Sequence, residues 1–367
     1  MPRLLSQFQV LAHDLSSSKQ CFSILLFATM MRCCTEEDRF VLPDLKLRSA
    51  KSKRPTPWPL LLISFALLAA AGLSTHKAPT VHRDLTHRTH RVKSVQKLPA
   101  PAGVSLPKMT AARTLPFAIG ENSGVLWNLS SGQLMWTHNP NLVQPYASTT
   151  KLMTIYLALH DLPLSQSVSI SPLAAATTGL DIRMTVGNRF TVRQLLYALM
   201  MDSANNSAVA LAQADSGSVP AFVAKMNHEA SLLGMSNTHY ADPDGLSPRS
   251  SGSAWDLSII ARADMLNPLF RQIVRTKEAS LPHNPIVRNL NGLLFMDPTV
   301  IGIKTGWTTK AGFNLVFAAT RHVAGQSVTL LGVIMHGQHG FLPEYQDAEK
   351  ILNWGFSHIK SATAITP

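Results

Sequence analysis

Apolar and polar residues alternate in a pattern that predicts strands at both ends of the C-terminal two thirds of the chain. The candidate strands are short apolar runs bounded by turn residues, at 117–120, 124–129, 133–136, 299–303, 312–319 and 327–335. Ser130-Ser131-Gly132 separates two of these runs as the turn of a hairpin.

Between these strands, apolar residues recur at helical spacing. The predicted helices cover residues 148–160, 192–201, 208–214, 219–234 and 254–266, and a last helix covers 347–355. Thr191 is a suitable N-cap for the second of them. Strands at both ends with helices between them predict one α+β domain over residues 114–360, in which the terminal segments share a sheet.

The residues before this domain are interpreted as three segments. A basic block precedes the apolar run 58–73, which is the layout of a secretory signal. As a helix, residues 59–73 span about 22 Å, less than the roughly 30 Å of a hydrocarbon core, so a cleaved signal peptide and an N-terminal membrane anchor both stay open. Residues 1–57 are then a cytoplasmic leader or lie upstream of the true start codon. Residues 74–113 are expected to be a flexible basic linker.

Charge and cysteine content argue against two classes of function. The chain has a net charge of +12, but residues 1–113 hold 17 Lys and Arg against 6 Asp and Glu, so the candidate domain is close to neutral. This distribution does not favour nucleic-acid binding. All three cysteines, Cys21, Cys33 and Cys34, also precede the domain, which excludes thiol catalysis and a cysteine-ligated metal within it.

Three polar clusters carry the candidate chemistry. Ser148 and Lys151 stand at the start of a predicted helix, where side chains three positions apart share a face at about 5–6 Å. An amine at that distance can remove the proton of a serine nucleophile. Ser203 and Asn205 follow in a loop between two helices, and Lys304-Thr305-Gly306 comes at the end of a strand.

In this order and these settings the clusters resemble those of the penicillin-recognising serine enzymes. The resemblance is strongest to the low-molecular-mass D-alanyl-D-alanine carboxypeptidases (serine peptidase family S11), which trim peptidoglycan stem peptides. Further similar stretches are residues 145–154, 195–211, 302–315 and 352–356. The resemblance implies a DD-peptidase/β-lactamase-like α+β fold, with an antiparallel sheet flanked by helices and an inserted, mostly helical subdomain.

The chemistry and the resemblance together give each catalytic residue an expected role. Ser148 attacks the carbonyl between two D-alanines, and Lys151 removes its proton, which requires a neutral amine. Burial beside the cation Lys304 is expected to lower the pKa of that amine. Ser203 relays the proton to the leaving D-alanine. The backbone N–H groups of Ser148 and Trp307 form the oxyanion hole.

The remaining residues of the clusters are expected to bind the substrate, a stem peptide ending in D-Ala-D-Ala. The amide of Asn205 holds the peptide backbone, Lys304 and Thr305 bind the terminal carboxylate, and Gly306 lets the substrate lie close to the sheet edge. β-Lactam antibiotics are expected to react as covalent inhibitors. The resemblance implies no metal and no cofactor.

Two departures from the family pattern bear on specificity. Many relatives have His where this chain has Trp307, and many have an Arg in the segment that here reads His336-Gly337-Gln338-His339. Carboxylate recognition then depends more on Lys304 and Thr305. An endopeptidase that cuts peptidoglycan cross-links therefore stays open as an alternative to the carboxypeptidase.

Two other functions fit the sequence less well. A β-lactamase generally needs a deacylating Glu with Asn four positions on, and neither Glu229 nor Glu278 has one. A catalytically idle wall-binding scaffold on the same fold is disfavoured because every catalytic side chain is present. The expected location is outside the cytoplasmic membrane of a bacterium, as a secreted protein or one anchored through residues 58–73.

Overall fold

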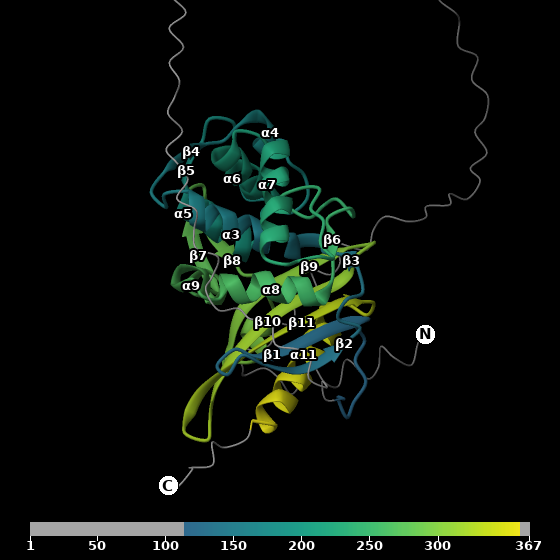
Figure 1. Cartoon of the computed structure of the whole chain (residues 1–367). Coiled ribbons are helices and arrows are strands. Elements are labelled where there is room, and N and C mark those ends of the chain that lie inside the picture. The colour runs from purple at the N-terminus through teal and green to yellow at the C-terminus, as the bar shows by residue number, and fades with distance from the viewer. Residues whose placement is uncertain (1–113, 360–367) are drawn as a thin grey trace, which may run out of the picture. The chain divides into compact units, whose positions relative to one another are not determined.

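A computed structural model describes residues 114–359 (Figure 1). The predictions of a leader at 1–57, a signal or anchor at 58–73 and a linker at 74–113 lie outside the described residues. Within the described part of the chain, no helix is both long and apolar enough to cross a membrane.

One antiparallel sheet of five strands forms the centre of the domain, in the order β2-β1-β11-β10-β9. Its strands are β1 (Ser123–Asn128), β2 (Gln133–His138), β9 (Val300–Thr308), β10 (Gly312–Val323) and β11 (Gln326–Gly337). β1 pairs with β11, so the two ends of the domain share one sheet as the sequence predicts. The apolar run 117–120 is not a strand; Phe117 and Ile119 only pack at the margin of the core.

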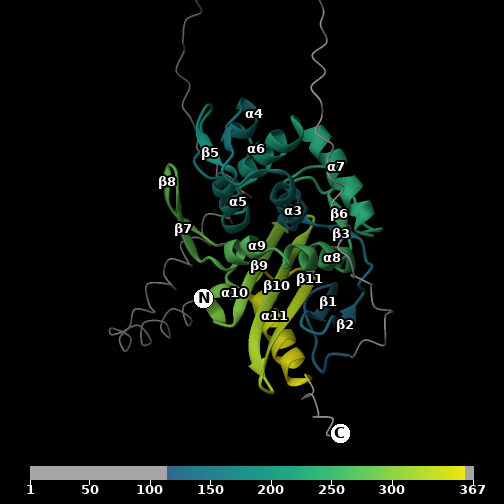
Figure 2. The ribbon, with the colours of Figure 1, turned by 60° about the vertical axis from the view of Figure 1, so that its left-hand side comes forward.

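Alternation along the strands gives the sheet two apolar faces. One face packs against α11 (Phe341–Ser357) and carries residues such as Leu315 and Phe317. The other carries Val316 and Ala318 and packs beneath most of the remaining helices, whereas Leu293 and Leu294 of α10 (Leu293–Met296) join the cluster on the α11 face. The turned view shows the same arrangement, with α11 on one side of the sheet and α3 (Lys151–Asp161), α8 (Ala254–Asp264) and α9 (Pro268–Arg275) on the other (Figure 2).

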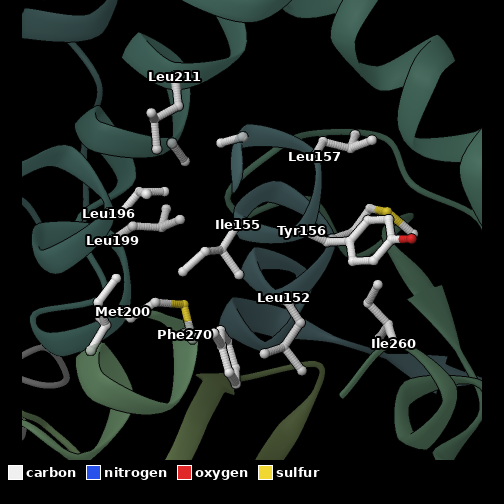
Figure 3. Packing of buried hydrophobic residues seen from close by; sticks show 14 of the residues in the cluster. Leu152, Ile155, Tyr156, Leu157, Leu196, Leu199, Met200, Leu211, Ile260 and Phe270 are labelled. Carbon is white, nitrogen blue, oxygen red and sulfur yellow. The ribbon is translucent and has the colours of Figure 1, made fainter. Parts of the chain in front are cut away.

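The helical layer is built around α3 (Lys151–Asp161), which is almost entirely buried. Its apolar side chains meet residues of α5, α6, α8 and α9 (Figure 3). The helices around it are α4 (Pro172–Ala175), α5 (Val192–Met201), α6 (Asn205–Ser216), α7 (Val219–Leu232), α8 (Ala254–Asp264), α9 (Pro268–Arg275) and α10 (Leu293–Met296). A capping box of Thr191 and Gln194 begins α5, which confirms the predicted N-cap.

Several of the sequence-based element boundaries are wrong. α6 begins at Asn205 rather than 208, and α11 begins at Phe341 rather than 347. β9 continues through Lys304-Thr305-Gly306, which therefore lies inside a strand and not at its end. Three short pairs of strands also interrupt the helical region: β3 (Gln144–Pro145) with β6 (Ser251–Gly252), β4 (Ser167–Ser169) with β5 (Arg189–Thr191), and β7 (Glu278–Leu281) with β8 (Asn284–Arg288). Strands of two to five residues are too short to show a period of two.

Candidate active site

Ser148 lies in a 3-10 turn, η1 (Ala147–Thr150), directly before α3. The sequence pattern places it in the first turn of the helix itself, but the chain enters through a sharper bend with Ala147 at φ +48°. Gly245, at φ +85°, lies against this bend, and a Cβ there would overlap the carbonyl of Ala147. The Thr149 hydroxyl donates to the carbonyl of Tyr146 at 2.6 Å. This turn, residues 146–150, is thus held by an internal hydrogen bond and by packing against Gly245, and it is called the nucleophile turn after the proposed nucleophile Ser148.

The amine of Lys151 is fully buried and donates to three oxygens. Nζ lies 3.0 Å from Ser148 Oγ, 2.8 Å from Asn205 Oδ1 and 2.6 Å from the carbonyl oxygen of Asp244. Three acceptors match the three donors of an ammonium group. The predicted contact between Ser148 and Lys151 is therefore present, and the other two partners hold the amine in place.

Burial lowers the pKa of Lys151 from its ordinary 10.5 to about 8, and the carboxylates of Asp244 and Asp242 oppose this shift. Burial, one of the two causes that the sequence suggested, is the leading one, whereas the charge of Lys304, the other suggested cause, does not contribute to this shift. The pKa of Lys304 is in turn well below its usual value, first because the amine is buried and then because Lys151 is close, with Asp202 opposing. Burial thus shifts both amines toward the neutral form.

Ser203 and Asn205 enter from the junction of α5 and α6. Ser203 has φ +58°, and its buried hydroxyl has no hydrogen-bond partner within residues 114–359. The Asn205 side chain joins Lys151 to the neighbouring loop, because its Nδ2 also donates to the carbonyl of Thr178 at 2.9 Å. One Nδ2 hydrogen remains for a ligand.

Strand β9 brings Lys304, Thr305 and Gly306 against the nucleophile turn. Lys304 is buried and its Nζ donates to the carbonyl of Thr305 at 2.9 Å. A Cβ on Gly306 would lie 3.1 Å from Ser148 N and 3.0 Å from Thr149 N. The glycine is therefore needed for the strand to approach this turn, a reason that the sequence did not reveal.

Trp307 follows on β9 and is half exposed. Its ring packs against Phe313 at a centroid distance of 5.9 Å, and Phe313 packs against Phe341 at 4.8 Å. The indole therefore belongs to a row of aromatic rings at the end of the sheet, while its backbone stays next to Gly306.

The loop that supplies the Asp244 carbonyl was not recognised from the sequence as part of the site. Asp242 organises it by accepting from the backbone N–H groups of Gly245 and Ser247 at 3.1 and 2.6 Å. The Thr154 hydroxyl on α3 donates to the carbonyl of Pro243 at 2.6 Å. The run Asp242-Pro243-Asp244-Gly245 is a recognisable turn sequence, so a signal for the bend was available.

The arrangement can support acyl transfer. It joins a serine to a buried amine that can be neutral near pH 8, and it adds a second buried amine, Lys304, and a buried hydroxyl, Ser203. In the described part of the chain, no group of three His, Cys, Asp or Glu residues is placed to hold a metal ion.

Residues 108–338 match the sequence profile of the D-alanyl-D-alanine carboxypeptidase family. The chain is 35% identical over 256 residues to a D-alanyl-D-alanine carboxypeptidase of Streptomyces sp. (strain K15), covering 64% of this chain and 86% of that protein. It is 32% identical over 259 residues to a D-alanyl-D-alanine endopeptidase of Pseudomonas aeruginosa, covering 68% and 81%. The crystal structure of the Streptomyces K15 DD-transpeptidase aligns with a TM-score of 0.61 at 33% identity, covering 66% of this chain and 100% of that one. By this match and these relatives, the chain belongs to the D-alanyl-D-alanine carboxypeptidase family of serine peptidases.

Proposed function

We propose that this protein is a serine-type D-Ala-D-Ala carboxypeptidase that removes the terminal D-alanine of peptidoglycan stem peptides. The observation that carries the proposal is the contact of the buried Lys151 amine with Ser148 Oγ at 3.0 Å. With a pKa of about 8, that amine has a neutral fraction near pH 7 that can accept the serine proton.

In the proposed acylation step, Ser148 Oγ forms a bond to the carbonyl carbon between the two D-alanines. Lys151 takes the serine proton, and the negative oxygen of the tetrahedral intermediate accepts from the N–H groups of Ser148 and Trp307. The carbon–nitrogen bond then breaks. The proton reaches the leaving amine by way of Ser203, and D-alanine departs.

The acyl-enzyme is then hydrolysed. A water molecule, losing its proton to Lys151, adds to the ester carbonyl, and the proton returns to Ser148 Oγ as the ester bond breaks. A penicillin follows the same first step, since its lactam carbonyl occupies the place of the scissile amide. Its leaving nitrogen remains attached to the acyl group, so we expect the penicilloyl group to be released from the enzyme slowly.

Substrate binding is assigned to the groups around the serine. The free hydrogen of Asn205 Nδ2 suits a carbonyl of the stem peptide, and Lys304 with Thr305 suits the terminal carboxylate. Gly306 keeps β9 close to the serine, so that a substrate bound along this strand lies near Ser148.

The test is mass spectrometry of a pentapeptide ending in D-Ala-D-Ala after incubation with the protein. Loss of one alanine, absent with Ser148→Ala, is the expected result. An unchanged pentapeptide would overturn the proposal. Rapid turnover of a chromogenic cephalosporin would instead indicate a β-lactamase, which the lack of a suitably placed Glu disfavours.

A DD-endopeptidase is the second candidate. The endopeptidase from Pseudomonas aeruginosa is among the relatives, and the segment His336-Gly337-Gln338-His339 lacks an Arg to read a free carboxylate. Incubation with a cross-linked dimer of stem peptides distinguishes the two activities. Separation of the dimer with no loss of alanine from the pentapeptide would favour the endopeptidase.

We further propose that the protein acts outside the cytoplasmic membrane, where its substrate lies. Residues 58–73 are assigned as a signal peptide or an N-terminal anchor, and residues 114–360 as the peptidase domain. N-terminal sequencing of the protein from its host tests this. A mature terminus shortly after residue 73 indicates cleavage, whereas one before residue 58 indicates an anchor.

A further inference from the structure

Asn314, on β10, has no role in the proposed reaction, yet its fully buried side chain makes three hydrogen bonds. Nδ2 donates to the carbonyl oxygens of Pro145 at 3.0 Å and Tyr146 at 3.1 Å. Oδ1 accepts from the backbone N–H of His336 at 2.8 Å. One side-chain amide therefore joins the segment leading to Ser148 to two strands of the sheet.

A bulge in the sheet explains why a side chain is needed here. The pairing of β10 with β11 shifts register between Phe313 and Leu315, and His336 has φ +64°. Such a bulge removes backbone groups from the ladder of hydrogen bonds. Asn314 Oδ1 accepts the N–H of His336 in place of a backbone carbonyl.

On its other side Asn314 pairs with Gly306 of β9. Gly306 is where β9 approaches the nucleophile turn, at 3.1 Å from a built Cβ to Ser148 N. The two assigned oxyanion donors therefore lie on either side of this contact. The N–H of Ser148 belongs to the turn, and that of Trp307 follows Gly306 in the strand.

We propose that Asn314 is a positioning residue: it holds the nucleophile turn against the sheet and thereby fixes the spacing of the two oxyanion donors. This inference rests on the proposed function. Holding catalytic groups in register is worth large factors in rate, since a displacement of about 1 Å costs on the order of 100-fold. The residue touches neither substrate nor the reacting atoms.

The variant Asn314→Asp tests the inference because it keeps the shape and the acceptor for His336. It replaces two donated hydrogen bonds by a carboxylate oxygen facing the carbonyls of Pro145 and Tyr146. Acylation by a fluorescent penicillin is followed over a range of concentrations. The expected result is a fall of about 100-fold in the limiting rate, with the half-saturating concentration within about 3-fold of native.

Asn289→Asp is the matched control. Asn289 is also buried, donates from Nδ2 to two carbonyls, of Val274 and Thr276, and accepts one backbone N–H, from Asn291. None of these hydrogen bonds involves a proposed catalytic residue. Its acylation rate should stay within about 3-fold of native, although it loses the same kind of bonds.

A pH series separates positioning from a general structural defect. At low pH the carboxyl group introduced by Asn314→Asp becomes protonated and can again donate a hydrogen bond. The ratio of the Asn314→Asp rate to the native rate should therefore rise as the pH is lowered from about 8 to about 5.

Equal limiting rates for native and Asn314→Asp, or an equal loss in Asn289→Asp, would overturn the inference alone. Absence of labelling of the native protein would overturn the proposed function and this inference with it. If Asn314→Asp does not fold, the uncharged variant Asn314→Ser is measured instead. A native-like limiting rate of acylation in Asn314→Ser would contradict the inference.

Discussion

The Lys151 amine lies 2.6 Å from the carbonyl oxygen of Asp244, a residue on a loop 93 positions further along the chain. This carbonyl orients the amine, while the carboxylate of the same residue opposes the lowering of the Lys151 pKa by burial. The same loop presses Gly245 against the nucleophile turn. One loop therefore sets both the orientation of the proposed base and the bend that presents Ser148.

The pH dependence of acylation should report the Lys151 amine. Its pKa is lowered to about 8, so the neutral, proton-accepting form is the minor one below that pH and grows as pH rises. We expect the acylation rate by penicillin to rise by roughly 10-fold from pH 6 to pH 7 and to level off above about pH 8. Stopped-flow labelling measures this. A rate that is flat over pH 6–8 would contradict the assignment of Lys151 as the base.

The same amine affects stability with a definite sign. Its folded pKa lies below that of the unfolded chain, so between about pH 8 and pH 10.5 the unfolded state binds more protons and the contribution of Lys151 to stability increases with pH. In Lys151→Met this contribution is absent. The difference in unfolding free energy between native and variant should therefore shift toward the native protein as pH rises through this window, measured by urea titration. A pH-independent difference would argue against the lowered pKa.

Gly245→Ala should be far more destabilising than a glycine change at a similar backbone angle elsewhere. Gly187 has φ +84°, close to the +85° of Gly245, but a Cβ there would have no heavy atom within 4 Å, whereas at Gly245 it would overlap the Ala147 carbonyl. Gly187→Ala should cost about 1–2 kcal/mol for the left-handed conformation alone. Gly245→Ala should cost several kcal/mol or prevent folding. Equal losses in thermal denaturation would contradict the packing of this loop against the turn.

Ser203 and Ser207 make a matched pair of buried serines. The Ser203 hydroxyl has no partner in the described structure, whereas Ser207 donates to the carbonyl of Leu195 at 2.6 Å. Ser203→Ala should leave stability within about 0.5 kcal/mol of native or raise it, while lowering peptide turnover by about 100-fold because the proton relay is lost. Ser207→Ala should do the reverse, costing about 1 kcal/mol with native turnover. Loss of turnover in Ser207→Ala alone would reverse the assigned roles.

Gly306→Ala should lower the rate of acylation more than the affinity for penicillin. The added methyl would lie 3.0–3.1 Å from backbone atoms of the nucleophile turn, so β9 and the turn must move apart. We expect acylation to fall by about 100-fold and stability by about 1–3 kcal/mol. Kinetics of penicillin labelling together with a melting curve measure both. An unaffected acylation rate would show that this contact does not set the geometry of the site.

The sequence was sufficient for the parts of the site that local spacing encodes. Ser148 and Lys151 are three positions apart, so their contact follows from helical geometry even though Ser148 lies in a 3-10 turn. The roles of Asp244 and Asn314 could not be foreseen in this way. Each contributes through a contact to a segment 93 or more positions away, which depends on how the loop and the sheet bulge pack.

The features of the fold divide in the same way, into those that the local sequence encodes and those that depend on tertiary contacts. The shared sheet of β1 and β11 followed from strands at both ends of the domain, and the cap at Thr191 from its residue type. The start of α6 at Asn205 was missed because polar residues at a helix start are usually read as a cap or loop. Asn205 bonds to Lys151, Asn206 donates to the carbonyl of Ile182 and Ser207 donates to that of Leu195, so tertiary contacts satisfy this polar helix start.

The most direct test of the account is intact-protein and peptide mass spectrometry after exposure to benzylpenicillin. We expect one penicilloyl group per chain, located on the peptide that contains Ser148, and no adduct in Ser148→Ala. Lys151→Met should fold and remain almost unlabelled over the same time. An adduct on another residue, an adduct that persists in Ser148→Ala, or a native protein that stays unmodified would contradict the assignment of Ser148 as the nucleophile.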